Sequence, residues 1–93
     1  MPDAVREQFQ DKAICRHGMW LYPKDVAIQI VEFCRQNEIR LDGIEGLWMY
    51  YDGSIQPTQE NSQWFTQETV HNAVEFLSGT DEECVFELFY EGY

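Results

Sequence analysis

Histidine is the side chain best suited to acid–base chemistry near neutral pH, and this chain of 93 residues holds two, His17 and His71. Neither lies in a metal-ligand pattern with cysteine or aspartate. On a helix, His71 lies three residues after Glu68 and four before Glu75. That spacing favours an exposed, ion-paired histidine over a catalytic one.

Cysteine is the next candidate for chemistry. Cys15, Cys34 and Cys84 are odd in number and widely spaced, with no Cys-x-x-Cys pair. This pattern indicates reduced, buried thiols in a cytoplasmic protein rather than a disulfide framework. Cys34 and Cys84 lie in apolar patterns, and a nucleophilic thiol needs a basic neighbourhood that residues 41–93 lack.

Other catalytic signatures are missing from the sequence. It has no Gly-rich phosphate loop and no Gly-x-Ser-x-Gly motif. The Asp52-Gly53-Ser54 segment lacks the further acids of a calcium loop. Carboxylate pairs can be drawn anywhere among seventeen acidic residues, so they carry little information. We therefore expect no enzyme activity, no metal and no cofactor.

Net charge is the most informative property of the chain. Seventeen acidic residues against six basic ones give −11, and all six basic residues lie within the first 40 positions. Residues 1–40 also hold six acids and are neutral, so residues 41–93 carry the whole net charge, with eleven acids and no base. Such a field repels nucleic acid and anionic membranes and attracts basic surfaces. Solubility alone is the plainer explanation of the same charge.

Length and composition predict one globular domain over residues 1–93, because 44% of the residues are hydrophobic and the chain is too short for two cores. The longest apolar run is too short for a membrane span, and Met1-Pro2-Asp3 lacks the regions of a signal peptide. We expect a cytoplasmic monomer or homodimer.

Two helices are predicted in the first half of the chain. Asp3 is a candidate N-cap for a helix that carries Val5, Phe9 and Ala13 on one face and fades before His17-Gly18. Pro23 then suits the first turn of a helix over about 23–36, which a left-handed Asn37 would stop. The apolar stripe of this second helix comprises Ala27, Ile30, Val31 and Cys34.

A β-hairpin is predicted over residues 46–57, because Asp52-Gly53 stands between apolar flanks. A two-residue turn there pairs Tyr51 with Ser54 and Tyr50 with Ile55. Pro57 cannot donate to the ladder, so the second strand is expected to be short and at an edge. Each face of the first strand carries large side chains, so one apolar or aromatic row stays outside unless another element covers it.

The last third of the chain predicts a polar loop, a helix and a strand. Residues 57–63 form the loop, Thr66 caps the helix, Phe65 can pack on Val70, and Gly79 ends it. Residues 84–90 form a strand whose inner face is Cys84, Phe86, Leu88 and Tyr90, and whose outer face, with Val85, Glu87 and Phe89, is partly wet. The fold class is therefore α+β, with two or three helices packed on a small antiparallel sheet.

Three stretches together resemble a known family: the helix exit Ile39-x-Leu41-x-Gly43, the turn Asp52-Gly53-x-Ile55-x-Pro57, and the aromatic segment of residues 84–90. From about Trp20 to Tyr90, the chain resembles the small immunity proteins of bacterial polymorphic-toxin systems, in particular the family numbered forty in that series. The resemblance implies a binding inhibitor of a cognate toxin and no catalytic residue.

An acidic inhibitor of this kind suits a toxin with a basic surface, such as a nuclease, because opposite charges steer the encounter. Aromatic side chains would supply the desolvated centre of the contact and acids its rim. The predicted partner-facing residues are Glu45, Tyr51, Asp52, Glu60, Trp64, Asp81, Glu82, Glu83 and Glu87.

Two other interpretations stay open. Every aromatic residue can belong to the core or be covered by the N-terminal helix. Alternatively, the chain is a phage or plasmid mimic of DNA that occupies a restriction or CRISPR nuclease, although that function needs regularly spaced carboxylates and the acids here are scattered apart from Asp81-Glu82-Glu83.

Overall fold

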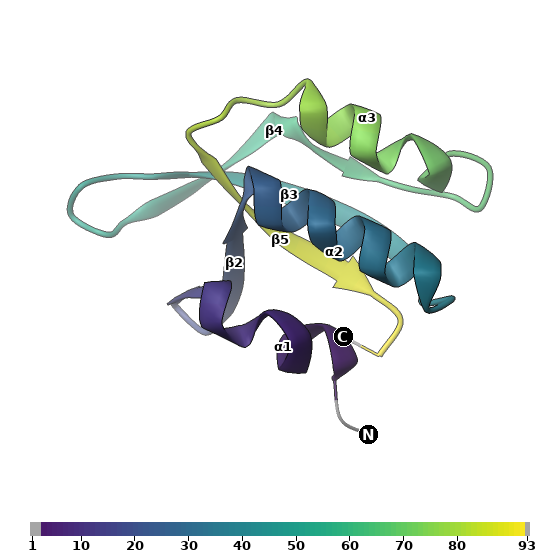
Figure 1. Ribbon diagram of the computed structural model, residues 1–93. Coiled ribbons are helices and arrows are strands. Elements are labelled where there is room, and N and C mark those ends of the chain that lie inside the picture. The colour runs from purple at the N-terminus through teal and green to yellow at the C-terminus, as the bar shows by residue number, and fades with distance from the viewer. Residues whose placement is uncertain (1–2, 93) are drawn as a thin grey trace.

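The computed structural model describes residues 3–92 (Figure 1). Residues 1–2 and residue 93 lie outside the described part. The prediction that the chain starts without a signal peptide rests partly on those first two residues. The described elements are helix α1 (Ala4–Phe9), 3₁₀-helix η1 (Gln10–Lys12), strands β1 (Ile14–Arg16) and β2 (Met19–Pro23), helix α2 (Lys24–Gln36), strands β3 (Leu41–Met49) and β4 (Ile55–Trp64), 3₁₀-helix η2 (Val70–Asn72), helix α3 (Ala73–Ser78) and strand β5 (Cys84–Tyr90).

The five strands of the described chain form one antiparallel sheet in the order β1-β2-β5-β3-β4, so the last strand inserts between β2 and β3. Helix α2 packs on β5 and β2 and contacts both other α-helices (Figure 1). This arrangement confirms the predicted α+β class with a small antiparallel sheet.

The N-terminal helix forms as predicted but is shorter. The Asp3 carboxylate accepts a hydrogen bond from the Arg6 amide at 3.0 Å, and Val5 and Phe9 are buried. After this helix, the structure contains a hairpin that the sequence does not predict: β1 and β2 are joined by His17 and Gly18, both with positive φ (52° and 77°). A three-residue strand is too short to show an alternating pattern, which is why the periodicity gives no sign of β1.

Helix α2 matches the predicted range, with Ala27, Ile30, Val31 and Cys34 all buried. Its predicted left-handed stop at Asn37 is wrong, because Asn37 has φ −104°. The left-handed residue is Glu38 (φ 56°). Asn37 instead turns its side-chain amide back to donate to the Phe33 carbonyl at 2.8 Å, and the same carbonyl accepts the Asn37 backbone amide at 3.0 Å.

The β3–β4 hairpin exists, but its predicted register is wrong by one residue. Trp48 pairs with Gln56 and Met49 with Ile55, because the connection is a longer turn with Gly53 at φ 86°. The Gly53 amide donates to the Tyr50 carbonyl and the Tyr50 amide to the Ser54 carbonyl, both at 2.9 Å. Since strand side chains alternate, the shift moves Ile55 to the face of Met49.

The polar segment of residues 57–63 is part of strand β4, so the predicted loop and short second strand are wrong. β4 is nevertheless an edge strand, as Pro57 predicts. A bulge interrupts its pairing with β3 between Ile44 and Gly46. Within the bulge, the Ser62 hydroxyl donates to the Thr58 carbonyl at 2.6 Å and accepts from the Gly46 amide at 3.0 Å. Side-chain hydrogen bonds thus replace ladder bonds in this polar stretch.

The third helical region is confirmed in outline. The Thr66 hydroxyl accepts hydrogen bonds from the Glu68 and Thr69 amides at 3.2 Å each, but regular α-helix begins only at Ala73, after η2. Phe65 makes an edge-to-face contact with Phe76, with ring centroids 6.1 Å apart. Gly79 follows the helix with φ −90°, so it is not a left-handed cap.

The two faces of the sheet bury different clusters. Cys84, Phe86, Leu88 and Tyr90 belong to the main core with the helices, as predicted. On the opposite face, Leu21, Leu47 and Val85 form a smaller buried cluster. Ile14 and Met19 from the β1–β2 hairpin and Met49 and Ile55 from the β3–β4 hairpin pack against it, so both hairpins contribute to this second cluster.

Candidate functional site

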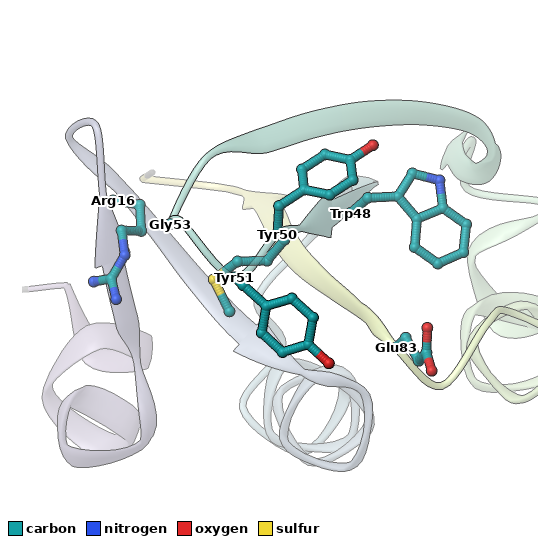
Figure 2. Close-up of a pocket in the computed structure, with 7 residues that line it drawn as sticks. Arg16, Trp48, Tyr50, Tyr51, Gly53 and Glu83 are labelled. Carbon is teal, nitrogen blue, oxygen red and sulfur yellow. The ribbon is translucent and has the colours of Figure 1, made fainter.

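The tip of the β3–β4 hairpin forms one wall of an open cavity of about 660 Å³, which we call the hairpin cavity (Figure 2). Its other walls come from β1 and from the loop that precedes β5. The lining residues are Arg16, Trp48, Met49, Tyr50, Tyr51, Gly53 and Glu83. Three aromatic residues of one hairpin, Trp48, Tyr50 and Tyr51, thus share the cavity with Glu83, which comes from a loop about 30 positions later in the chain.

Hydrogen bonds within the turn fix the hairpin tip. One oxygen of the Asp52 carboxylate accepts from the Ser54 hydroxyl at 2.6 Å and from the Ser54 amide at 2.9 Å. These bonds lower the pKa of Asp52, since they favour its charged form. Gly53 adopts a positive φ that other residues rarely reach, and it lies beside Arg16 of strand β1. The turn is therefore ordered by its own residues.

The aromatic residues of the cavity differ in exposure. Tyr51 is fully exposed and Tyr50 is 49% exposed, with its hydroxyl donating to the Gln56 side chain at 2.8 Å. Trp48 is half-buried, because its side of the sheet packs on the main core. The cavity therefore combines one ring held by the core, one held by a hydrogen bond and one free at the tip.

Glu83 reaches the cavity because Trp48 pairs with Cys84 across β3 and β5, which brings the preceding loop beside the indole. The Glu83 amide donates to the Asp81 carboxylate at 2.8 Å, which orders this acidic loop. In the described chain, ion pairs join Asp3 to Arg6, Glu32 to Arg35 and Asp42 to Arg40. None of them involves the acids of residues 81–83.

A second exposed aromatic feature, the Trp64 patch, lies at the opposite end of β4 and consists of Trp64, Phe89 and Gly43. The Trp64 ring is 71% exposed and lies 5.2 Å from the Phe89 ring, centroid to centroid. It covers Gly43 so closely that a Cβ there would lie 2.3 Å from a ring carbon. Glycine is thus required at position 43 for this packing.

Two carboxylates stand next to the patch. Glu45 and Glu87 face each other directly across β3 and β5, on the same side of the sheet as Trp64. Burial raises the pKa of Glu45, and the Glu87 charge raises it further. Glu87 is only 6% exposed, so the predicted wet face of β5 is wrong at this position.

The predicted partner-facing residues therefore divide into separate groups. Tyr51 and Glu83 line the hairpin cavity and Asp52 lies in the adjacent turn, whereas Glu45, Trp64 and Glu87 gather at the other end of the sheet. Tyr51 and Trp64 do not share one acidic rim, because the ten-residue strand β4 separates them.

The remaining predicted acids lie near the β4 bulge. The Asn61 side chain accepts a hydrogen bond from the Asp81 amide at 3.0 Å, which joins the bulge beside Glu60 to the loop that holds Asp81 and Glu82. Glu60, Asp81 and Glu82 are all exposed.

Sequence reasoning missed Arg16, Trp48, Met49, Tyr50 and Gly53 as site residues. Trp48 lies in the first strand of the predicted hairpin and Tyr50 at the start of its turn, where the Tyr50 amide donates to the Ser54 carbonyl. No sequence signal places Arg16 there, because the short strand β1 is invisible in the pattern.

The groups considered for catalysis show no constellation. His17 and His71 are exposed and lie in separate elements, one in the β1–β2 turn and the other in η2. Cys34 and Cys84 are buried as predicted, but Cys15 is exposed, which corrects the prediction for that thiol. Within residues 3–92, no three His, Cys, Asp or Glu side chains are grouped so that they could hold a metal ion.

An apolar cavity of about 380 Å³ also lies between the end of α2 and the segment that leads into α3, and its lining includes Cys34, Phe65 and Val74.

Over the part of the chain that the structure covers, no helix is long and apolar enough to cross a membrane. No protein-family model, curated protein or solved structure gives a significant match to this chain.

Proposed function

We propose that this protein is a small binding inhibitor that neutralises a cognate bacterial toxin by direct protein–protein contact in the cytoplasm. The observation that carries the proposal is the exposure of Tyr50, Tyr51 and Trp64 within a half of the chain that has eleven acids and no base. Large exposed aromatic side chains of this kind are typical of binding hot spots. The sequence resemblance to immunity proteins points to the same function.

Charge and aromatic residues would have different tasks in such a complex. The acids of residues 41–93 would attract a basic toxin surface from a distance and raise the association rate. The tyrosines at the hairpin tip would then supply the desolvated contact area that exposed charge pairs lack. A nuclease is the class of toxin that best fits this charge, because its cleft binds phosphates.

The hairpin tip suits this task because it protrudes and yet is ordered. Tyr51 is fully exposed, while the Asp52–Ser54 hydrogen bonds fix the turn that carries it. A preformed contact loses less conformational entropy on binding than a flexible loop does.

The decisive test is co-expression with the protein encoded by the adjacent gene, taken as the candidate toxin. We expect the wild-type protein to restore growth of the host cells and to co-purify with the toxin. Tyr51→Ala should weaken the complex by more than about 2 kcal/mol, the usual hot-spot threshold, with an unchanged melting temperature. Gln8→Ala, on the exposed side of α1, is the matched control and should bind normally.

If the toxin stays fully active in the presence of excess folded protein, the proposed function is wrong. If the toxin is neutralised but Tyr51→Ala binds like Gln8→Ala, the function stands and the contact lies elsewhere, with the Trp64 patch as the next surface to test.

A further inference from the structure

The hairpin cavity has the composition of a site for an organic cation. The rings of Trp48, Tyr50 and Tyr51 come from one hairpin, and the Glu83 carboxylate faces the same cavity from the loop before β5 (Figure 2). A cation over an aromatic ring is attracted by the negative face of the π-system, most strongly by tryptophan. A carboxylate within the same cavity adds a charge-assisted hydrogen bond.

The charges around the cavity are arranged unevenly. Glu83 lies toward the Trp48 side, whereas Arg16 lies on the other side, next to Gly53 (Figure 2). The Arg16 guanidinium donates to the carbonyl of Cys15 at 2.9 Å, so it is held at its own strand. Glu83 follows Asp81 and Glu82, and these three acids form no ion pair in the described chain. The Trp48–Glu83 side is therefore the negative part of the cavity.

Two of the three rings are positioned before any ligand arrives. Trp48 packs against the main core, and the Tyr50 hydroxyl donates to Gln56. Planar guanidinium groups stack on such rings and pair with a carboxylate at the same time, which a compact ammonium group does less well.

We propose that the hairpin cavity receives an arginine side chain of the protein partner, with the guanidinium stacked on the aromatic rings and hydrogen-bonded to Glu83. This inference rests on the proposed function, since it names the chemistry by which the partner is recognised. It assigns Glu83, rather than its neighbours Asp81 and Glu82, as the acid that contacts the partner directly.

The first test needs no toxin. Because the chain has three tryptophans, three indole N–H signals report on ligand binding in an NMR titration with N-acetyl-arginine amide. We expect the Trp48 signal to shift and saturate with a dissociation constant below about 10 mM, while the Trp20 and Trp64 signals stay in place. N-acetyl-citrulline amide, which has nearly the same shape and no charge, should give no saturable shift. Equal shifts with both compounds, or no saturation with the arginine compound, would overturn the inference.

Variants then assign the role of each charge. Glu83→Gln should weaken binding of the arginine compound about tenfold, as expected for loss of a charged hydrogen-bond partner. Glu82→Gln is the matched control, because it removes the same charge from the adjacent exposed position. Arg16→Gln should bind at least as tightly as the wild type, because it removes a repelling charge. Equal effects of the two glutamate variants would show a diffuse field instead of a site.

The two proposals fail in distinguishable ways. If the arginine compound binds at Trp48 but no toxin is neutralised, the site stands and the proposed function is wrong. If the toxin is neutralised equally well by the wild type and by Glu83→Gln, the function stands and the arginine site is wrong. The native spectrum of each variant, recorded in the same titration, shows that it is folded.

Discussion

The phenol of Tyr90 donates to the carboxylate of Asp3, 87 positions earlier in the chain, with oxygen–oxygen distances of 2.8 and 2.9 Å. The same carboxylate caps helix α1 through the Arg6 amide. One partly buried contact therefore ties the start of the first helix to the last strand, where Tyr90 belongs to the main core.

Removing the hydroxyl group should affect stability differently at two buried tyrosines, Tyr90 and Tyr22. Tyr90→Phe removes a hydrogen bond to a charged group and should lower the free energy of unfolding by about 1–3 kcal/mol. Tyr22→Phe should change it by less than about 0.5 kcal/mol or raise it, because the buried Tyr22 hydroxyl has no hydrogen-bond partner among residues 3–92. Urea denaturation of both variants, each of which keeps its ring, measures the difference. Equal losses would contradict the assignment.

The same tyrosines predict alkaline instability. Burial raises the pKa of Tyr22 to about 12, and burial together with the Asp3 hydrogen bond raises the pKa of Tyr90 further. Above the unfolded value of about 10, the folded state thus binds more protons than the unfolded state. The two tyrosines therefore add no pH dependence below pH ~10 and should make stability fall as the pH rises from there. The raised pKa values of the buried Cys34 and Cys84 thiols act in the same direction from about pH 9 upward. Melting temperatures between pH 8 and 12 test this, and Tyr90→Phe should show a shallower decline. A flat profile would mean that neither hydroxyl is desolvated.

Two glycines of β3 should respond differently to an added methyl group. A Cβ at Gly46 would lie 2.4 Å from the backbone oxygen of Asn61, whereas the atoms nearest to a Cβ at Gly43 belong to the exposed side chain of Trp64. Backbone in the β4 bulge cannot move aside easily, so Gly46→Ala should destabilise by about 1–3 kcal/mol and Gly43→Ala by less. The double variant Gly43→Ala/Trp64→Ala serves as control. Without the indole, the methyl group at position 43 should cause no further loss of stability relative to Trp64→Ala alone. Chemical denaturation of the variants gives the values, and the reverse order would be evidence against the bulge packing.

The three thiols should react at different rates. Cys15 is exposed, whereas burial raises the pKa of Cys34 to about 11, and burial together with nearby acids raises that of Cys84. Only the thiolate reacts, so a thiol reagent at neutral pH should modify one cysteine quickly and all three after unfolding. Mass spectrometry identifies the labelled residue, and fast labelling of Cys34 in the folded protein would contradict the described core.

If the proposed function is right, association with the toxin should depend on salt. Added salt screens the field of residues 41–93 and should slow association, while dissociation changes little because it depends on the close contacts. Stopped-flow or surface-based kinetics at several ionic strengths measure both rates. A salt-independent association rate would remove the steering argument but leave the binding function intact.

The sequence alone determined the elements whose residues carry a long repeating pattern. Helix α2 and strand β5 appear at the predicted residues, because each buries a full stripe or face of apolar side chains in the main core. The Asp3 and Thr66 caps were likewise predictable, since the chemistry of an N-cap is local. The concentration of acids in the second half of the chain is visible without any structure.

Tertiary structure decided what depends on contacts between distant segments. The register of the β3–β4 hairpin was set by a longer turn, and the polar residues of β4 became a strand because β3 supplies their partner and Gly46 admits the bulge. The composition of the hairpin cavity follows from the same cause. Arg16 and Glu83 join Tyr50 and Tyr51 only in the folded chain, where β1 and the loop before β5 come to lie around the hairpin tip. Local sequence patterns cannot encode such a meeting, because it arises from pairings between strands that lie far apart in the chain.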